Sequence, residues 1–498
     1  MTARAVRVLV LTLASVLALL ACSPDPTSLD PADRTLRVGA SLEPPTLDPT
    51  GSDAASIPQA LLYNVYETLV KINTDGEIRP LLAQRWEISK DHTRYTFTLA
   101  KATFASGRPV TSEDVAWSIK KVRGGHNIAA ASQLSVIKSV DTPDASTVVF
   151  RLSRPSNSWL FAMASTAGMI FDSHSTSDFA TVPAGSGPYR LERWTKGSDL
   201  VLARNDAYWQ VRPAFASVTF RYFGDPNAMN SALLSGGLDV ITNLQVPQTL
   251  PQFADPSRFT VTEGTTNGEV VMALNNSAKP LQDKRVRQAI NYAVDRRALV
   301  DTVWNGKGTL IGSMVPPTDP WYTDLSKTYP YDPAKARQLL ADAGYAKGLP
   351  LRMRVPVVPY ATASGQFVAS QLADVGIQVS IEELEFPRWL DQVFTKADYD
   401  ISIVAHVEAR DIVRFADPRY YFRYDNPAVT RLVAEADAGN ETAQIAKMKQ
   451  VALILAQDAA ADWLFLLPNL AVSTAEVTGV PKNATTLSFD LFTIDKSS

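Results

Sequence analysis

Cysteine and histidine are scarce in this chain of 498 residues, which holds a single cysteine, Cys22, and four histidines. A lone cysteine excludes a disulfide within the chain. The histidines are scattered, and neither a His-x-x-x-His nor a Cys-x-x-Cys pair occurs. Because zinc sites depend on such spacings, we expect neither a metal site nor a cofactor.

The motifs of common enzyme classes are also missing. No Gly-x-Ser-x-Gly elbow is present, and the glycine-rich segment 185–187 lacks the Gly-Lys-Ser/Thr of a phosphate-binding loop. The acidic pair Glu382-Glu383 lies beside the strand predicted at 377–381, where a solvated sheet edge is the simpler interpretation. The sequence therefore gives little support for an enzyme.

The charge balance excludes another class. The formal net charge is −3, and no basic stripe occurs of the kind that nucleic-acid-binding proteins carry. Hydrophobic residues make up 46% of the chain, which is ordinary for a soluble globular protein. The length is sufficient for two or three domains.

The first residues resemble an export signal. Arg4 and Arg7 precede the apolar run 8–21, which is shorter than the roughly 20 residues that a membrane-spanning helix needs. Leu19-Leu20-Ala21-Cys22 resembles a lipobox, in which the cysteine becomes the lipidated N-terminus. An ordinary signal peptide that happens to contain a cysteine is the alternative.

We therefore expect a signal peptide at 1–21 and lipidation at Cys22. Cleavage would remove two arginines and take the formal net charge from −3 to −5. Proline, serine and aspartate are frequent just after the cysteine, so 22–34 is predicted to be a flexible tether.

Beyond the tether, the apolar pattern alternates between the helical and the strand period. Thr111 and Asp114 have the spacing of a helix N-terminal cap, and Asp332-Pro333 opens a helix that ends at Gly344. The interleaving predicts an α/β protein. The pattern predicts strands at 36–40, 95–99, 146–152 and 463–467, and helices at 60–71, 283–304, 333–343 and 441–457.

The stretch 81–122 carries the most specific pattern. Its segments 86–99 and 104–115 resemble W-E-x-S-x-D-G-x-T-Y-T-F-x-L and F-x-x-G-x-P-hydrophobic-T-x-x-D-V. Both occur in this order in the bacterial extracellular solute-binding proteins of family 5, the peptide/nickel class of ABC importers. The chain departs from the family at His92, where glycine is usual, and at Ala105-Ser106, where many members carry His-Asp. Further similar segments are Gly185 to Leu191, Arg204 to Trp209 and Arg285 to Arg296.

The resemblance covers nearly all of 36–467 and implies a two-lobed periplasmic-binding-protein-like α/β fold (type II) with an extra α/β domain. A monomer would trap a solute between the lobes and deliver it to a membrane permease with its ATPase. Lipidation would hold the exported protein on the outer face of the cell membrane, on the periplasmic or cell-surface side. The implied domains are lobe I at 35–62, 184–270 and 465–498, the extra domain at 63–183, and lobe II at 271–464.

The segment 406–424 is the richest polar and aromatic cluster. Arginine can bind a carboxylate through two parallel hydrogen bonds, and aromatic rings can stack on a ligand or a guanidinium. A solvated loop with internal ion pairs is the alternative. The arginines of the cluster are Arg410, Arg414, Arg419 and Arg423.

The resemblance also implies an acid after the strand 398–403 that pairs with the α-ammonium of a peptide. An ungapped match places Ala409 at its position, with Glu408 and Asp411 on either side. The family further implies that the loop 52–58 borders the cleft. We therefore expect ligand contacts at Ser56, His406, Glu408, Arg410, Asp411 and Arg414.

The implied ligand is an oligopeptide. A metal chelate, an opine-like compound or a sugar remains open within the same importer class. A surface sensor or adhesion module that retains the fold is the alternative from another class.

Overall fold

The computed structural model describes residues 34–497. The predicted signal peptide, the lipidation site Cys22 and nearly all of the predicted tether lie outside these residues. Within the described part of the chain, no helix combines the length and apolar character that crossing a membrane would require.

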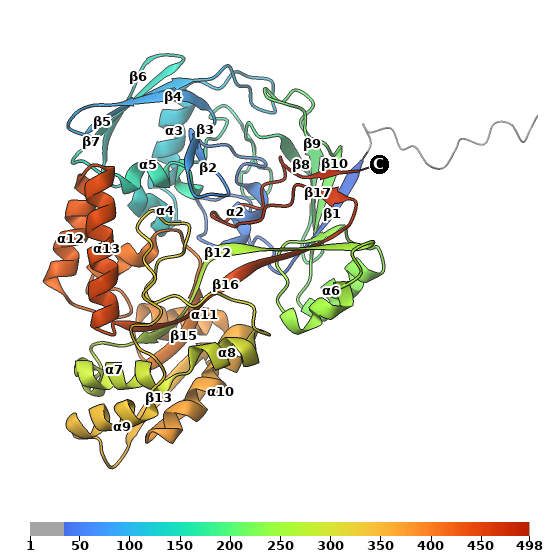
Figure 1. Ribbon diagram of the computed structural model, residues 1–498. Helices are drawn as coiled ribbons and strands as arrows, with labels where there is room; N and C mark the ends of the chain where they lie inside the picture. Colours follow the sequence, from blue (N-terminus) through green and yellow to red (C-terminus); the bar gives the residue numbers. More distant parts are fainter. Residues whose placement is uncertain (1–33, 498) are drawn as a thin grey trace, which may run out of the picture.

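A ten-stranded sheet runs through the molecule in the order β14-β13-β15-β12-β16-β11-β1-β10-β9-β8 (Figure 1). The β1 end of this sheet and its β14 end are each covered by their own helices (Figure 1). Strands at the β1 end are β1 (Thr35–Ala40), β8 (Tyr189–Thr195), β9 (Asp199–Arg204), β10 (Ser217–Tyr222) and β11 (Val240–Ile241). Strands at the β14 end are β13 (Leu349–Pro356), β14 (Ile377–Leu384) and β15 (Ile401–His406).

Two long antiparallel strands, β12 (Phe259–Leu274) and β16 (Ala461–Thr474), join the two ends of the sheet. Their pairing shifts register between Thr265 and Glu269, where Pro468 lies opposite Thr265. β16 therefore continues past the proline at which the predicted strand ended, because a register shift tolerates a residue without an N–H.

Helices at the β14 end bury their apolar faces against the sheet. Asp332 accepts a hydrogen bond from the Lys335 N–H at the start of α9, and Gly344 past its end has a φ of 91°. The single helix predicted at 283–304 is two helices, because the Asp295 side chain accepts from the Ala298 N–H and starts a second one. These helices are α7 (Lys284–Ala293), α8 (Arg296–Val303), α9 (Pro333–Asp342) and α10 (Pro359–Asp374).

A four-stranded antiparallel sheet forms the extra domain, in the order β4-β5-β7-β6 (Figure 1). The predicted strand 95–99 and the predicted helix cap are confirmed, since β5 ends at Leu99 and α3 opens on a capping box of Thr111 and Asp114. His92 has a φ of 53°, the left-handed conformation that glycine usually supplies. The elements are β4 (Ala83–Ile88), β5 (Arg94–Leu99), β6 (Ile137–Asp144), β7 (Thr147–Leu152), α3 (Ser112–Arg123), α4 (Ile128–Gln133) and α5 (Ser158–Ala162).

The helix predicted at 60–71 is wrong. Helix α2 (Ser56–Leu61) ends early, and the hairpin of β2 (Val70–Ile72) and β3 (Ile78–Pro80) follows. Tyr63 has a φ of 64°, and the Asn64 side chain donates to the Phe489 carbonyl at 2.9 Å. The segment is buried on every side, so its apolar run carries no period that separates helix from coil.

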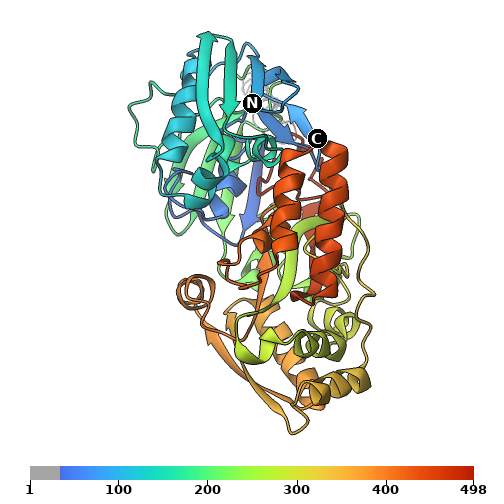
Figure 2. The same ribbon diagram turned by 90° about the vertical axis from the view of Figure 1, so that its left-hand side faces the viewer.

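The helical hairpin of α12 (Pro427–Ala438) and α13 (Glu441–Gln457) reaches from the β14 end to the extra domain (Figure 2). The bounds of α13 agree with the predicted helix 441–457. The remaining elements are α6 (Pro226–Leu234), α11 (Phe386–Trp389), η2 (Thr166–Gly168), η3 (Pro247–Phe253), η4 (Lys279–Gln282), η5 (Leu390–Thr395), η6 (Asp411–Ala416), β17 (Val477–Thr478) and β18 (Asp495–Lys496).

Candidate ligand-binding cleft

A cavity of about 670 Å³ lies where three parts of the chain meet. The loop before α2 and residues 485–487 line it from the β1 end of the sheet. Helices α4 and α5 line it from the extra domain, and the segment 407–417 with α12 and α13 lines it from the β14 end. A molecule in this cavity would touch all three parts, so its contacts would favour the arrangement that brings them together.

Four of the six predicted ligand contacts line this cavity, namely Glu408, Arg410, Asp411 and Arg414. Ser56 is not among the lining residues, because it is 5% exposed and its hydroxyl donates to the Glu43 carbonyl at 3.1 Å. Ser52, Asp53 and Ala54 of the same loop line the cavity instead.

His406 also lies behind the cavity wall, where it holds Asp411 in place. Its Nδ1 lies 2.9 Å from Asp411 Oδ2, and its Nε2 lies 2.8 Å from the Tyr421 hydroxyl. The His406 and Tyr421 rings stack with an interplanar angle of 10°. Two hydrogen bonds and a stacked ring therefore fix the imidazole and, through it, one oxygen of Asp411.

The other carboxyl oxygen of Asp411 lacks a hydrogen-bond partner among the described residues. Among residues 34–497, Asp411 Oδ1 is a buried atom with no hydrogen-bond partner. Burial raises the pKa of Asp411, while the hydrogen bond from His406 opposes that shift. Glu269, paired across the sheet with His406, is also buried, and its burial together with the nearby Asp411 charge raises its pKa well above the usual range. A cation in the cavity would pair with Asp411, which lines it.

Glu408 differs from Asp411 because it already has a partner. Its Oε2 accepts from Arg414 Nη2 at 2.9 Å, and about half of its side chain is exposed. Both residues of this ion pair line the cavity, and each is the charged partner of the other.

Arg410 is held by aromatic rings. Its guanidinium carbon lies 3.8 Å from the centre of the Phe161 ring and 4.9 Å from that of Trp321. Phe161 belongs to α5 of the extra domain, so this contact crosses from one side of the cavity to the other. Asp319 and Glu441 are the charges that act on Arg410, and burial raises the pKa of Asp319 to about 7.

A contact that the sequence did not predict closes the cavity at the end of α12. The Asp437 carboxylate accepts from the Ser156 hydroxyl at 2.9 Å, and Arg154 Nη1 lies 2.6 Å from its other oxygen. Asn157 N–H donates to the Asp437 carbonyl at 2.8 Å. No local pattern reveals this contact, because its two sides lie far apart in the sequence.

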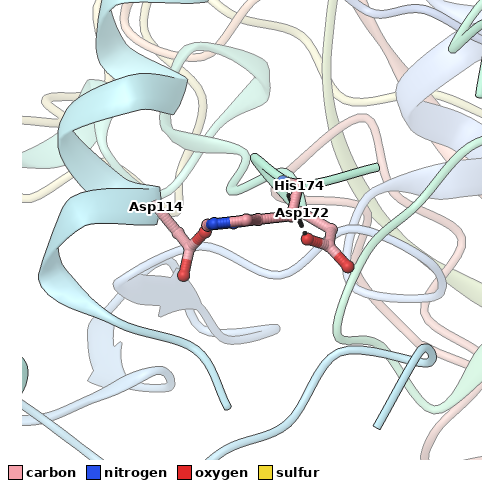
Figure 3. A group of neighbouring side chains, drawn as sticks. All are labelled: Asp114, Asp172 and His174. Atoms are coloured by element: carbon pink, nitrogen blue, oxygen red, sulfur yellow. Dashed lines mark hydrogen bonds between the residues drawn. The ribbon is translucent and has the colours of Figure 1, made fainter. Parts of the chain in front are cut away.

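The carboxyl groups of Asp114 and Asp172 and the His174 ring lie together in the extra domain, outside the cavity (Figure 3). Such a trio could hold a metal ion, but Arg108 already supplies a positive charge to it. Arg108 Nη2 lies 2.9 Å from Asp172 and also contacts Asp114. The single guanidinium therefore pairs with both buried carboxylates, and the arrangement is an ion-pair network.

The sequence pattern of the bacterial extracellular solute-binding proteins, family 5 Middle, matches residues 77–424. The chain is 29% identical over 473 residues to the probable D,D-dipeptide-binding periplasmic protein DdpA of Escherichia coli (strain K12), covering 86% of this chain and 88% of that protein. The dipeptide-binding protein of the same organism is 28% identical over 378 residues, covering 68% and 69%.

Solved structures show the same fold. The binding protein AgaA of A. tumefaciens R10, solved with agropinic acid, has a TM-score of 0.81 at 24% identity and covers 93% of this chain and 99% of its own. The dipeptide binding protein of Pseudoalteromonas sp. SM9913, solved with Met-Leu, has a TM-score of 0.82 at 20% identity and covers 93% and 100%. The predicted two-lobed type II fold is thereby confirmed. The chain belongs to the bacterial extracellular solute-binding proteins of family 5, which are substrate-binding components of ABC transporters and not enzymes.

Proposed function

We propose that this protein is the lipid-anchored receptor of an ABC importer and captures oligopeptides in the cavity between its lobes. The observation that carries the proposal is that Asp411, which lines that cavity, has a buried carboxyl oxygen without a hydrogen-bond partner among residues 34–497. A peptide ammonium would pair with it, because an unpaired carboxylate in a closed cleft is costly. The relatives named for dipeptides support a peptide ligand.

The geometry favours Asp411 over Glu408 as the acid that meets the peptide ammonium. Glu408 is already paired with Arg414, whereas Asp411 has one oxygen oriented by His406 and the other without a partner within the described residues. His406 thus acts behind the carboxylate and does not line the cavity. Ala409, at the position of the family's acid, lines the cavity but carries no charge.

The proposed domain division gives the mechanism. Lobe I would comprise 35–62, 184–270 and 465–498, the extra domain 63–183, and lobe II 271–464. Since all three line the cavity, a ligand there favours their closed arrangement, and the closed form would dock on the permease. Strands β12 and β16 connect the lobes, so their register shift is a natural place for bending.

An opine-like solute is the second candidate. Arg410 presents a guanidinium to the cavity without an ion-pair partner among residues 34–497, and such a group suits an acidic, non-peptide compound as well as a peptide. AgaA, with a similar fold, was solved with agropinic acid.

Identification of the bound solute tests the proposal. Native mass spectrometry of gently purified protein should show co-purified peptides, and a peptide library should raise the melting temperature. Asp411→Asn should lower the affinity for peptides with a free N-terminus by roughly tenfold or more. The affinity for N-acetylated peptides should stay nearly unchanged, because these lack the ammonium. Absence of both bound peptide and thermal shift would refute the peptide receptor.

A further inference from the structure

Arg410 presents its guanidinium to the cavity in a defined orientation. The Phe161 ring at 3.8 Å and the Trp321 ring at 4.9 Å lie against it, and all three residues line the cavity. Aromatic contacts restrict the planar group without using its N–H donors. The edge of the guanidinium therefore stays available for hydrogen bonding.

These donors have no acceptor within residues 34–497. The structure records no hydrogen bond or ion pair for the Arg410 side chain, and its Nε is buried without a partner. Asp319, the charge that acts on it, also has a buried oxygen without a partner in the described chain. A buried N–H donor without an acceptor is unfavourable, and the described residues supply none to Arg410 Nε.

The other arginines of the cavity wall are satisfied. Arg414 pairs with Glu408 at 2.9 Å, and Arg154 pairs with Asp437 at 2.6 Å. Among the described residues that line the cavity, Arg410 is thus the arginine whose guanidinium has no acidic partner.

The backbone at Arg410 is also unusual, because its φ is 61°. A side chain with a Cβ rarely adopts this left-handed conformation, and such residues persist where the surrounding structure or a function requires them. Here the conformation starts η6 and accompanies the placement of the guanidinium on the Phe161 ring, next to the cavity.

We propose that Arg410 determines specificity by binding a carboxylate of the ligand through paired hydrogen bonds, so that the protein selects solutes with an acidic group. This inference rests on the proposed function of the cavity as the ligand site. A planar fork held against aromatic rings matches the two oxygens of a carboxylate. The acidic group would be a side-chain or a C-terminal carboxylate.

Arg410 and Asp411 are neighbours in the cavity wall, and the Asp319 charge interacts with both of them. A ligand that carries both a carboxylate and an ammonium could pair the carboxylate with Arg410 and the ammonium with Asp411.

Matched pairs of probes test the inference by isothermal titration calorimetry. The pairs are Ala-Glu with Ala-Gln, Ala-Ala with its C-terminal amide, and glutarate with glutaramide. Wild-type protein should bind the acidic member of at least one pair roughly 10- to 100-fold more tightly. Arg410→Gln should bring that ratio close to one, and Arg410→Lys should give an intermediate ratio because it retains charge but loses the fork.

The matched control is Arg419→Gln. Arg419 lies in the same segment, its side chain is 86% exposed and paired with Asp417, and it does not line the cavity. This variant should keep the wild-type ratio. Circular dichroism and the melting temperature check that each variant is folded.

The outcomes separate the two proposals. An unchanged ratio in Arg410→Gln, or a wild-type ratio of one in every pair, overturns the role of Arg410 even if peptides bind. A ratio seen only with glutarate supports Arg410 and refutes the peptide ligand. A purely structural role would weaken both members of a pair equally. Failure of the folded wild-type protein to bind any probe overturns both proposals.

Discussion

Asp437, near the end of α12, accepts two hydrogen bonds from Ser158, the first residue of α5, one from its N–H at 2.9 Å and one from its hydroxyl at 2.6 Å. The two residues approach the cavity from opposite sides and both line it. If the lobes close on a ligand as proposed, this pair would belong to the closed arrangement. It also connects the extra domain to α12.

Asp437→Ala should shift the protein toward an open arrangement. Loss of these charge-assisted hydrogen bonds costs about 1 to 2 kcal/mol in the closed state, which would lower affinity by roughly 5- to 30-fold for every ligand alike. Small-angle X-ray scattering of the ligand-free variant should show a larger radius of gyration, and titrations should give the uniform loss.

Glu435→Gln is the control for Asp437. Glu435 lies on the same helix but pairs with Lys447 of the neighbouring α13, so the pair does not cross the cavity. Its scattering curve and affinities should match those of wild type. A ligand-selective loss in Asp437→Ala, with unchanged scattering, would instead mean that Asp437 contacts the ligand.

Glu67 should make stability depend on pH. Burial raises the pKa of Glu67 to about 7, although Trp209, Ser186 and Tyr208 donate hydrogen bonds that oppose the shift. The folded state thus favours the protonated acid. The stability that protonated Glu67 contributes to the folded state is fully present below the unfolded pKa of 4.5. It is lost as the pH rises through about 7, the pKa in the folded state.

Glu67→Gln removes this titration. Between pH 4.5 and 8, the wild-type free energy of unfolding should fall by up to roughly 3 kcal/mol relative to that of the variant. Denaturant unfolding at several pH values measures the difference. Glu263→Gln, which removes an exposed partner of Lys307, should follow the wild-type curve. Parallel curves for wild type and Glu67→Gln would contradict the raised pKa.

Arg108→Met should destabilise the extra domain. The variant leaves the buried Asp114 and Asp172, both drawn in Figure 3, without the guanidinium that pairs with them. Breaking a buried ion pair on one side costs about 3 to 5 kcal/mol, although the partial exposure of Arg108 places the expected loss at the lower end. Thermal and denaturant unfolding measure the change.

Arg79→Met gives the comparison for Arg108. Its partner Glu77 is more than half exposed, so the loss should stay below about 1 kcal/mol. A chelator such as EDTA should leave the unfolding curve of wild type unchanged, because the charge opposite the acids is an arginine. Stabilisation of wild type by a divalent cation would show that the trio binds metal after all.

Cys22→Ser tests the lipid anchor. If Cys22 carries the lipid, the wild-type protein should partition with membranes, whereas the variant should appear in the soluble exported fraction or accumulate as precursor. Cell fractionation with immunoblotting measures the distribution, and an inhibitor of lipoprotein signal peptidase should block maturation of wild type. An identical membrane fraction under all three conditions would contradict lipidation.

Local signals in the sequence were sufficient for many elements. Asp332 and Gly344 mark the two ends of α9 as predicted, because a capping side chain and a left-handed glycine act within one helical turn. Thr111 and Asp114 open α3 for the same reason. The helix predicted at 60–71 does not form around Tyr63 and Asn64, because the conformation there depends on contacts with Phe489 near the far end of the chain.

The sequence by itself determined the family, the two-lobed fold and most helices and strands, since ordered motifs, caps and apolar periods are properties of neighbouring residues. It also pointed to the segment that holds Asp411 and Arg410. Only the tertiary structure decided which charged side chains of that segment lack a partner within the part of the chain that it describes. Glu408 is paired with Arg414, Asp411 is oriented by His406, and Arg410 lies on Phe161 of a distant helix. Whether a charge is available to a ligand depends on every group that folding brings beside it, and spacing along the chain does not record those groups.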